Sequence, residues 1–247
     1  MYFISAPFGN YININNSTSV TGSWTLAPRP GLAKQIATTL RYTRSGWTNR
    51  IGLRNTTLRY TRSGWTNRIG LRNKGIAYAL KHHRGSNVMS LAAIEKDDWL
   101  HLHSLVDEHT SVEINISCPN LGKQVDQLYP GFDLWTQGSR KWCIAKISPT
   151  ADNKLIDKLV DSGYNVIHAS NTLDSAQGAL SGKVLIPYTM GIIEYIREVH
   201  PQVEVIAGGG VTCPQDAEDY FNAGADHISL GTVCFTPWKL KAIINGQ

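Results

Sequence analysis

Strand-like and helix-like segments alternate along the later part of this chain, and this alternation limits the possible folds more than any other feature. Apolar runs of strand length occur at residues 87–92, 112–117, 142–147, 165–170, 203–207 and 227–230. Helical patterns occur at residues 152–160, 188–199, 214–222 and 238–244. Such alternation is typical of a parallel sheet with helical crossovers. No linker rich in Gly, Pro or Ser interrupts it, so we expect residues 1–247 to form a single domain.

The N-terminal part is less regular. Strands are expected at residues 4–7 and 19–22, but residues 10–17 between them are rich in Asn and Ser and favour no helix. A parallel crossover usually needs a dozen or more residues, mostly helical. A chain of 247 residues suits an α/β fold of the (β/α)8 TIM-barrel type, typically ~250 residues. We therefore expect such a barrel with a shortened N-terminal side that leaves its completeness open.

Residues 38–55 recur without a single change at residues 56–73. Each copy holds four arginines and no acidic residue, so the formal net charge of +5 would be +1 without one copy. A solenoid needs several diverged repeats, which this tandem duplication lacks. The mixture of Arg, Tyr and Trp also resembles RNA-binding surfaces. Because the positive charge follows from the duplication, we expect no nucleic-acid partner and a surplus copy looped out of the fold.

The sequence shows no sign of a membrane or metal-binding protein. No apolar run approaches ~18 residues, and the N-terminus lacks the basic and apolar regions of a secretory signal. The cysteines are scattered, with no C-x-x-C pair and no His pair at zinc spacing: Cys118, Cys143, Cys213 and Cys234. Reduced cysteines and a cytoplasmic location are the expectation, without a membrane or a metal site.

The segment 112–120 contains the most distinctive candidate site. Apolar and polar residues alternate up to Ser117, as in a strand with two different faces, and Pro119 ends the strand. Cys118 therefore lies at a strand exit between the amides of Asn115 and Asn120. A thiol placed between neutral hydrogen-bonding groups suits proton transfer on a polar ring. The alternative is that Cys118 is one more small buried residue, as free cysteines often are.

Glycines follow two consecutive strands near the C-terminus. Residues 208–210 are all glycine and precede a helix that starts near Pro214, and a Gly-Thr pair follows the next strand. Glycines let backbone amides approach an anion, and a helix N-terminus favours negative charge. No G-x-G-x-x-G with a downstream acid is present, so one phosphate, as in FMN, fits better than NAD. The candidate phosphate contacts are Gly182, Gly209, Gly210, Gly231 and Thr232.

The segment 115–120 resembles the strand-end signature of the dihydroorotate dehydrogenase family. Further stretches resemble motifs of that family and follow in the same order: residues 67–73, 144–147, 170–172, 178–182, 206–211 and 230–232. The resemblance runs from about Phe3 to Trp238. It implies a TIM barrel that binds FMN and oxidises dihydroorotate to orotate in pyrimidine biosynthesis.

The resemblance also assigns roles to individual residues. It implies that Cys118 removes the C5 proton of dihydroorotate while hydride passes from C6 to flavin N5. Flavin contacts are implied for Ser23, Asn115 and Lys146. Substrate contacts are implied for Asn67, Asn115, Asn120, Asn171 and Thr172. Cys rather than Ser as the base resembles the soluble class, whose electron acceptor is fumarate or, through a partner subunit, NAD. We also expect a homodimer.

Two departures from the family pattern bear on these roles. Thr21-Gly22-Ser23 stands where the family usually has a lysine at the second position, which puts recognition of the substrate carboxylate in question. The duplication offers both Asn49 and Asn67 as the substrate asparagine. We favour Asn67, because its copy runs directly into residues 74–80, the helix-like stretch that follows the substrate loop.

Two other functions remain open from the sequence. A tRNA-dihydrouridine synthase-like flavoprotein also uses a barrel, FMN and a Cys-Pro motif, but that family tends to read N-x-G-C-P where this chain has Ser117. A catalytically idle flavin-binding homologue would fit Gly22, the short first crossover and the duplication. A flavin spectrum that bleaches with dihydroorotate would distinguish these possibilities.

Overall fold

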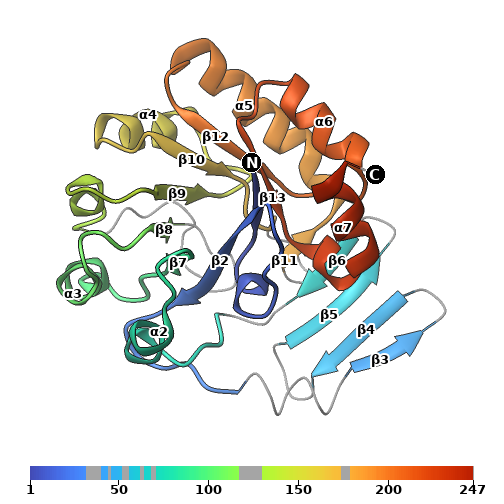
Figure 1. Ribbon diagram of the computed structural model, residues 1–247, viewed down its shortest axis with the longest axis horizontal. Coiled ribbons are helices and arrows are strands. Elements are labelled where there is room, and N and C mark those ends of the chain that lie inside the picture. The colour runs from blue at the N-terminus through green and yellow to red at the C-terminus, as the bar shows by residue number, and fades with distance from the viewer. Residues whose placement is uncertain are drawn as a thin grey trace.

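The computed structural model describes residues 1–31, 40–43, 46–51, 56–61, 64–67, 71–116, 130–173 and 179–246. Eight strands form a closed parallel barrel in the order β1-β13-β12-β10-β9-β8-β7-β2 (Figure 1). Their bounds are β1 Tyr2–Ile4, β2 Ser17–Trp24, β7 Val88–Leu91, β8 Val112–Asn115, β9 Cys143–Ile147, β10 Val166–Ala169, β12 Glu204–Gly208 and β13 His227–Leu230. The expected α/β barrel is therefore confirmed.

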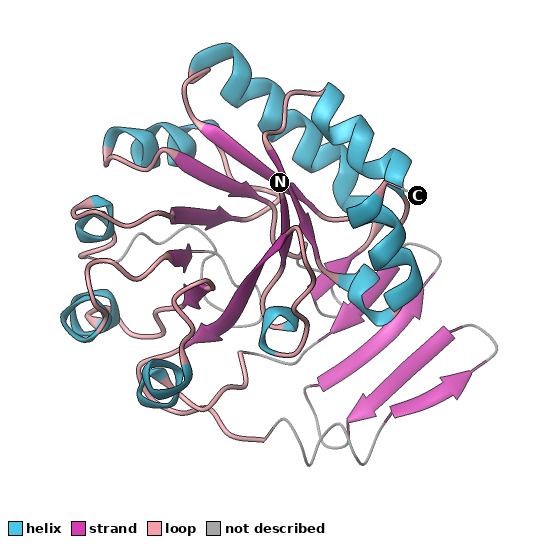
Figure 2. Cartoon of the chain, in the orientation of Figure 1, coloured by secondary structure: helices cyan, strands magenta, loops and turns pink. Residues whose placement is uncertain are grey.

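Helices surround the barrel on its outer side (Figure 2). They are α2 Ile76–His82, α3 Asp98–Leu105, α4 Asn153–Asp161, α5 Ile186–Val199, α6 Pro214–Asn222 and α7 Pro237–Asn245. Two of them show why they start where they do. The Asp152 carboxylate accepts a hydrogen bond from Leu155 N at the start of α4, and Pro214 occupies the first turn of α6, where no N–H is needed. All four helices expected from the sequence are present.

The first crossover lacks an α-helix, as the sequence suggested, yet the barrel closes. β1 pairs with β2 from Tyr2↔Ser17 to Ile4↔Ser19, and the connection contains only the 3-10 turn η1, Phe8–Asn10. Gly9 lets this turn lie directly on β2, since a Cβ there would come within 2.3 Å of the Val20 carbonyl oxygen. The expected strand at residues 4–7 is wrong in its bounds, because β1 already ends at Ile4.

The barrel interior consists of an apolar layer with a polar layer above it. Near the start of the strands, six inward-facing apolar side chains pack together: Phe3, Val20, Val88, Ile144, Val166 and Ile206. Because side chains alternate along a strand, the next inward positions lie two residues further along. On β7 to β10 these positions hold buried polar residues, namely Ser90, Glu113, Lys146 and His168. The polar layer thus lies toward the carboxyl ends of the strands.

Both copies of the duplicated segment form β-hairpins. The first copy contributes β3 Leu40–Thr43 and β4 Gly46–Ile51, and the second contributes β5 Thr56–Thr61 and β6 Gly64–Asn67. With β11 Ala179–Ser181 they form an antiparallel sheet in the order β11-β6-β5-β4-β3, which projects beside the barrel (Figure 1). The expectation of a looped-out copy is therefore wrong, since the first hairpin extends the sheet that the second hairpin begins.

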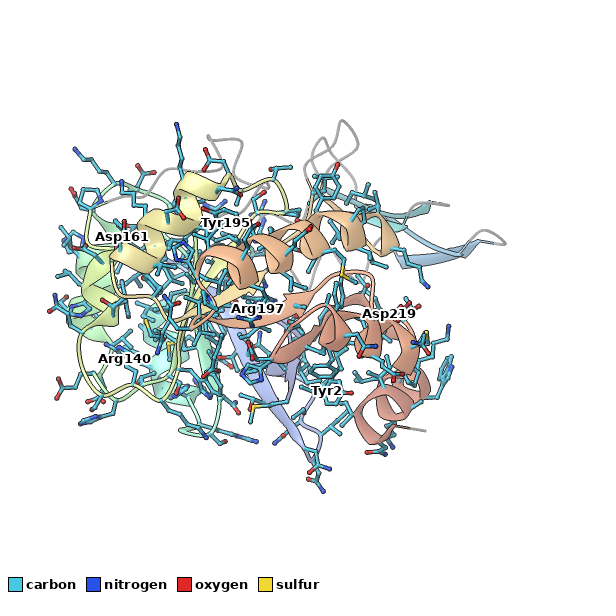
Figure 3. The ribbon with its side chains drawn as sticks, turned by 90° about the horizontal axis from the view of Figure 1, so that it is seen from above. Tyr2, Arg140, Asp161, Tyr195, Arg197 and Asp219 are labelled. Atoms are coloured by element: carbon cyan, nitrogen blue, oxygen red, sulfur yellow. The ribbon has the colours of Figure 1, made fainter. Side chains whose placement is uncertain are left out.

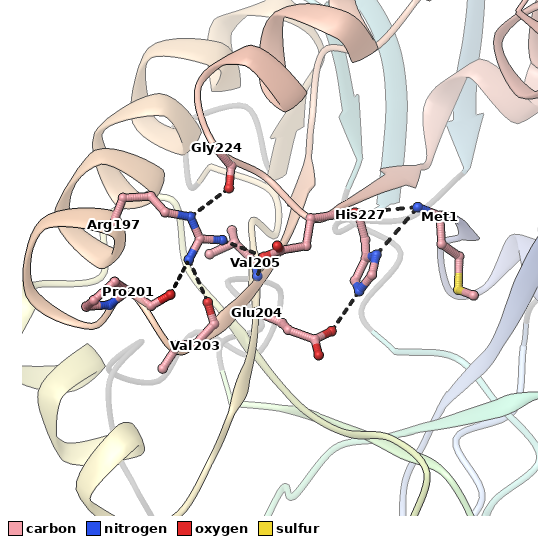
Figure 4. A network of polar contacts seen from close by, with 9 residues as sticks. Met1, Arg197, Pro201, Val203, Glu204, Val205, Gly224 and His227 are labelled. Atoms are coloured by element: carbon pink, nitrogen blue, oxygen red, sulfur yellow. Dashed lines mark hydrogen bonds and ion pairs between the residues drawn. The ribbon is translucent and has the colours of Figure 1, made fainter.

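Polar contacts tie the outer helices to the barrel. Figure 3 shows Tyr195 and Arg197 on α5, outside the barrel. The Arg197 guanidinium donates to the carbonyl oxygens of Gly224 and Val203, both at 2.7 Å, and pairs with Asp226 (Figure 4). The segments that lead into β12 and β13 are thereby joined to one side chain at the end of α5.

Candidate functional site

Three of the predicted site residues meet at the carboxyl ends of the strands. Asn115 is the last residue of β8, Asn171 follows β10, and Ser23 lies near the end of β2. Asn171 Nδ2 donates to Asn115 Oδ1 at 3.0 Å, and Asn115 Nδ2 donates to Ser23 Oγ at 3.0 Å. In an α/β barrel this end of the strands carries the functional groups.

Directly below these amides lies a buried charged cluster. Lys146 Nζ is 3.7 Å from Glu113 Oε1, and His168 Nδ1 is 2.6 Å from Glu113 Oε2. The Ser90 hydroxyl donates to Glu113 Oε1 at 2.8 Å. Glu113 is fully buried and Lys146 is 6% exposed, so the lysine charge is compensated inside the protein, as a buried cation requires.

The protonation states in this cluster follow from burial and from neighbouring charge. Burial alone raises the pKa of Glu113, but the Lys146 charge and the hydrogen bonds from His168 and Ser90 outweigh it and hold the pKa at about 2. Burial, with the nearby Lys146 charge, lowers the pKa of His168 below its ordinary value. At neutral pH the carboxylate is ionised and the imidazole is neutral, with its Nδ1–H directed at Glu113.

The glycine loop after β12 has a backbone that only glycine adopts readily. Gly209 and Gly210 have φ angles of +89° and +79°, a region that L side chains rarely occupy. A Cβ at Gly209 would lie 2.8 Å from the Leu185 side chain, and one at Gly210 would lie 2.7 Å from that of Ile186. These two glycines are thus required by the packing of the loop against the start of α5, with or without a ligand.

Gly231 and Thr232 offer a different geometry. Thr232 begins the 3-10 turn η5, Thr232–Phe235, and the first N–H groups of such a turn have no partner within it. A Cβ at Gly231 would have only Ser5 atoms near it, at 3.8 Å or more. The space beside Gly231 therefore admits a Cβ, and the first backbone N–H groups of η5 adjoin it. A phosphate group fits such a cradle.

The N-terminus of α6 does not belong to this cradle. The Asp216 carboxylate accepts hydrogen bonds from Thr212 N at 2.7 Å and Cys213 N at 3.2 Å, and Lys183 Nζ lies 3.0 Å from it. The negative charge favoured at this helix end is thus supplied by the chain's own carboxylate, which occupies the N–H groups of Thr212 and Cys213.

Gly22 stands where a lysine was expected, and the structure leaves no room for a side chain there. Its φ angle is +103°, and a Cβ would lie 2.4 Å from the carbonyl oxygen of Ser90. Its N–H donates to Asn10 Oδ1 at 3.1 Å. The close contact between β2 and β7 therefore excludes a lysine at position 22. Within the described part of the chain, Lys146 is the cation of the polar layer.

The remaining predicted residues are placed as follows. Thr172 follows Asn171 and donates its N–H to Asn171 Oδ1 at 2.9 Å. Gly182, with φ +117°, precedes the 3-10 turn η4, Lys183–Leu185. Asn67 ends β6 with its backbone opposite Ala179 of β11, and its side chain lies outside the described atoms. Cys118 and Asn120 also lie outside the described residues.

Sequence reasoning did not single out Glu113, Ser90 or His168 as site residues. A signal for Glu113 was present, because it shares the alternating face of its strand with Asn115. Nothing in the sequence indicated that Ser90 and His168, each on a different strand, would contact that carboxylate.

Two features are absent from the described residues. Among them, no helix combines the length and the apolar character needed to cross a membrane. Within the same residues, no group of three or more His, Cys, Asp or Glu side chains is placed to hold a metal ion.

Comparison with known proteins assigns the family. The chain is 26% identical to "Dihydroorotate dehydrogenase B (NAD(+)), catalytic subunit" of Desulforamulus reducens, over 97% of this chain and 83% of that protein. The same-named subunit of Listeria monocytogenes is 27% identical over 93% and 79% of the two chains. The match to the Geotalea uraniireducens subunit is shorter and spans 53% of that relative.

Solved structures show the same fold. The ligand-free DHODH from Eimeria tenella superposes with a TM-score of 0.67 at 16% identity, over 92% of this chain and 75% of that one. The same enzyme in complex with ferulenol gives a TM-score of 0.66. Residues 7–246 match the family described as dihydroorotate dehydrogenase, and the chain therefore belongs to the dihydroorotate dehydrogenase family.

Proposed function

We propose that this protein is an FMN-dependent oxidoreductase that converts dihydroorotate to orotate. The observation that carries the proposal is the set of amides at the carboxyl ends of β8 and β10, with a buried cation beneath them, in a chain of this family. Amides donate and accept at once, so Asn115 and Asn171 match the edge of a pyrimidine ring without imposing a charge.

In this proposal each residue has a defined task. Cys118, three residues beyond Asn115 in the chain, takes the C5 proton, while Asn67, Asn120, Asn171 and Thr172 hold the ring. Bound FMN supplies an acceptor for the hydride from C6. Lys146 places a positive charge beneath the site, which favours negative charge in the group above it.

The phosphate of FMN would be held by Gly231 and Thr232, with Gly182, Gly209 and Gly210 shaping the adjoining loops. The cradle beside Gly231, and the N–H groups at the start of η5, support this assignment. Loops after the last two strands form phosphate sites in many barrels.

The electron acceptor and the assembly belong to the proposal as well. Relatives named as NAD(+)-type catalytic subunits favour transfer to NAD through a partner subunit over direct transfer to fumarate. A cytoplasmic location rests on the scattered cysteines, and a homodimer is the assembly proposed here.

Gly22 favours a second candidate, a flavin-binding homologue with no activity toward dihydroorotate. Loss of the lysine at this position removes a cation from the site, and the packing of Gly22 on Ser90 prevents its return without a change in the backbone. Such a protein would bind FMN, yet dihydroorotate would leave its flavin spectrum unchanged.

The test of the proposed function is anaerobic flavin reduction. Dihydroorotate should bleach the flavin absorbance of the purified protein, and Cys118→Ala should keep the flavin but slow bleaching by at least ~10²-fold, the usual effect of losing a general base. Stopped-flow absorbance measures both rates.

Cys143→Ala is the matched control for that experiment. Cys143 starts β9, at the opposite end of the strand from Lys146, and its thiol donates to the carbonyl oxygen of Trp135. It should bleach at the parental rate. Equal rates in Cys118→Ala and the parent would remove Cys118 from the mechanism, and flavin that never bleaches would favour the idle homologue.

Cofactor binding has its own test at Gly231. The space beside Gly231 admits a Cβ at ordinary contact distance from Ser5, so Gly231→Val should yield folded protein with at least ~10-fold weaker FMN affinity, the effect of losing about one good hydrogen bond to a charged group. Gly191→Val, at an exposed helix position with no atoms near its Cβ, is the control. Flavin fluorescence titration of the apoprotein measures both, and an unchanged FMN affinity in Gly231→Val would place the phosphate elsewhere.

A further inference from the structure

Hydrogen bonds link the site amides to the buried carboxylate in an unbroken chain. Asn171 contacts Asn115, and Asn115 contacts Ser23, each at 3.0 Å. Ser23 Oγ is 2.8 Å from Ser90 Oγ, and Ser90 Oγ is 2.8 Å from Glu113 Oε1. The chain joins residues on or next to strands β10, β8, β2 and β7 and ends on β8, so it depends on the lateral order of these strands in the barrel.

The direction of every hydrogen bond follows from the charge at one end. An ionised carboxylate only accepts, so Ser90 must donate its single hydroxyl proton to Glu113. Ser23 must then donate to Ser90, which leaves only its lone pairs to face Asn115. Asn115 must therefore turn its NH₂ toward Ser23 and its oxygen toward Asn171. This order is the one in which the atoms are found.

We propose that Glu113 is a positioning residue that fixes which way the Asn115 and Asn171 amides point, acting through Ser90 and Ser23. The orientation of an amide decides whether a ring bound above it meets a donor or an acceptor. The role as a guide for a pyrimidine rests on the proposed function, whereas the hydrogen-bond chain belongs to the protein alone.

Two other contacts keep Glu113 able to perform this task. His168 Nδ1–H donates to Oε2, the oxygen that Ser90 does not use, and Lys146 Nζ lies 3.7 Å from Oε1, the oxygen that accepts from Ser90. Both atoms of the carboxylate are therefore occupied by donors. The Glu113 carboxylate is therefore held in place and ionised, which lets it fix the direction of the hydrogen-bond chain.

Substitutions of Ser90 and Glu113 separate this role from a merely structural one. Ser90→Ala cuts the chain but leaves the contacts of Glu113 with Lys146 and His168, while Ser90→Thr keeps the hydroxyl. Glu113→Gln makes the end group able to donate as well as accept, so both amide orientations become possible. The side-chain NH₂ signals of Asn115 and Asn171, in protein labelled with ¹⁵N-asparagine, report the orientation and its stability.

We expect Ser90→Ala and Glu113→Gln each to speed hydrogen exchange of the Asn115 NH₂ group about tenfold, the effect of losing one hydrogen bond worth ~1.4 kcal/mol. Ser90→Thr should exchange at the parental rate. The double variant should exchange no faster than Ser90→Ala, because both changes break the same chain. If the Asn115 NH₂ group exchanged at the parental rate in Ser90→Ala, the proposal would be overturned, even if Glu113→Gln failed to fold.

Binding of orotate to the flavin-loaded protein provides the functional measurement. Ser90→Ala and Glu113→Gln should weaken orotate binding by the same factor of about ten, and Ser90→Thr should not. If orotate binding weakened in Glu113→Gln but not in Ser90→Ala, the carboxylate would act only through Lys146, and the proposal would be overturned. If the parent protein binds no orotate, the proposed function fails, and the amide exchange rates still decide the role of Glu113.

Discussion

The barrel and the repeat sheet are built in opposite ways. In the barrel, β1 pairs with β13, and Tyr2 lies opposite Ile228 from the other end of the chain. In the antiparallel sheet of the duplicated segment, called here the repeat sheet, β3, β4 and β5 each pair with the next strand along the sequence. The barrel therefore depends on long-range register, whereas the repeat sheet depends on local hairpins that can be added one at a time.

The difference also decides how each region tolerates change. A residue inside the barrel is fixed by neighbours from several strands, as Gly22 is by Ser90. A whole hairpin in the repeat sheet is contacted mainly by an identical hairpin. We therefore expect single substitutions in the barrel to cost more stability than the removal of 18 residues from the sheet.

The largest effect is expected for Gly22→Lys, which restores the residue that the family usually has. The backbone strain at positive φ costs ~1–3 kcal/mol, and overpacking against Ser90 costs a similar amount, so the free energy of unfolding should fall by roughly 3–5 kcal/mol. Urea denaturation measures it. Gly85→Lys, at a position with no atoms near its Cβ, is the control and should change the stability little. Equal stability of the two variants would show that the barrel wall yields as easily as a surface turn.

A smaller effect is expected at acidic pH. The pKa of Glu113 is about 2 in the folded protein and 4.5 in a free carboxyl, so the unfolded chain binds the proton first as the pH falls. Its contribution, about 3 kcal/mol from linkage, is complete above pH 4.5 and is lost as the pH falls toward 2. The lowered pKa of His168 adds a loss in the same direction below about pH 6.5.

Urea denaturation between pH 2 and pH 7 measures this dependence. In Glu113→Gln the free energy of unfolding should depend less on pH below pH 4.5. In Glu108→Gln, which changes an exposed carboxylate, it should depend on pH as in the parent protein. If the stability of Glu113→Gln fell with pH as steeply as that of the parent protein, the acid sensitivity would arise outside the barrel interior.

The smallest effect is expected when one repeat is removed. Deleting residues 38–55 or residues 56–73 yields the same sequence, because the copies are identical. The remaining hairpin can pair with β11 as β6 does, and its free edge repeats the sequence of β3. The free energy of unfolding should therefore change by less than about 1 kcal/mol, within the range of a surface change. Calorimetric or urea unfolding measures this change. A much larger fall in the free energy of unfolding would show that both hairpins are part of the core.

Point variants sharpen the same comparison between the copies. Asn67 lies next to β11 and Asn49 lies opposite Leu58 within the sheet, although their local sequences are identical. Asn67→Ala should weaken orotate binding and Asn49→Ala should not. The reverse result would assign the first copy to the substrate.

Much of the fold could be predicted because its signals are local. The alternation of strands and helices and the glycines after β12 and β13 are each visible within a few residues. The lack of a first helix was also visible, in residues 10–17. Closure of the barrel despite that lack was not, because it depends on η1 packing on β2 through Gly9. The position of the repeats beside β11 escaped prediction for a similar reason, since β6 pairs with a strand far along the chain.

The sequence by itself determined the family motifs, the order of the strands along the chain and the polar residues at their ends. The tertiary structure alone decided which of those residues meet. Glu113 and His168 are 55 positions apart in the chain, and Ser23 and Asn115 are 92 apart, yet both pairs are in contact. The physical reason is closure. A parallel barrel places the same level of every strand around one axis, so a charge on one strand is compensated by side chains from strands far away in the sequence.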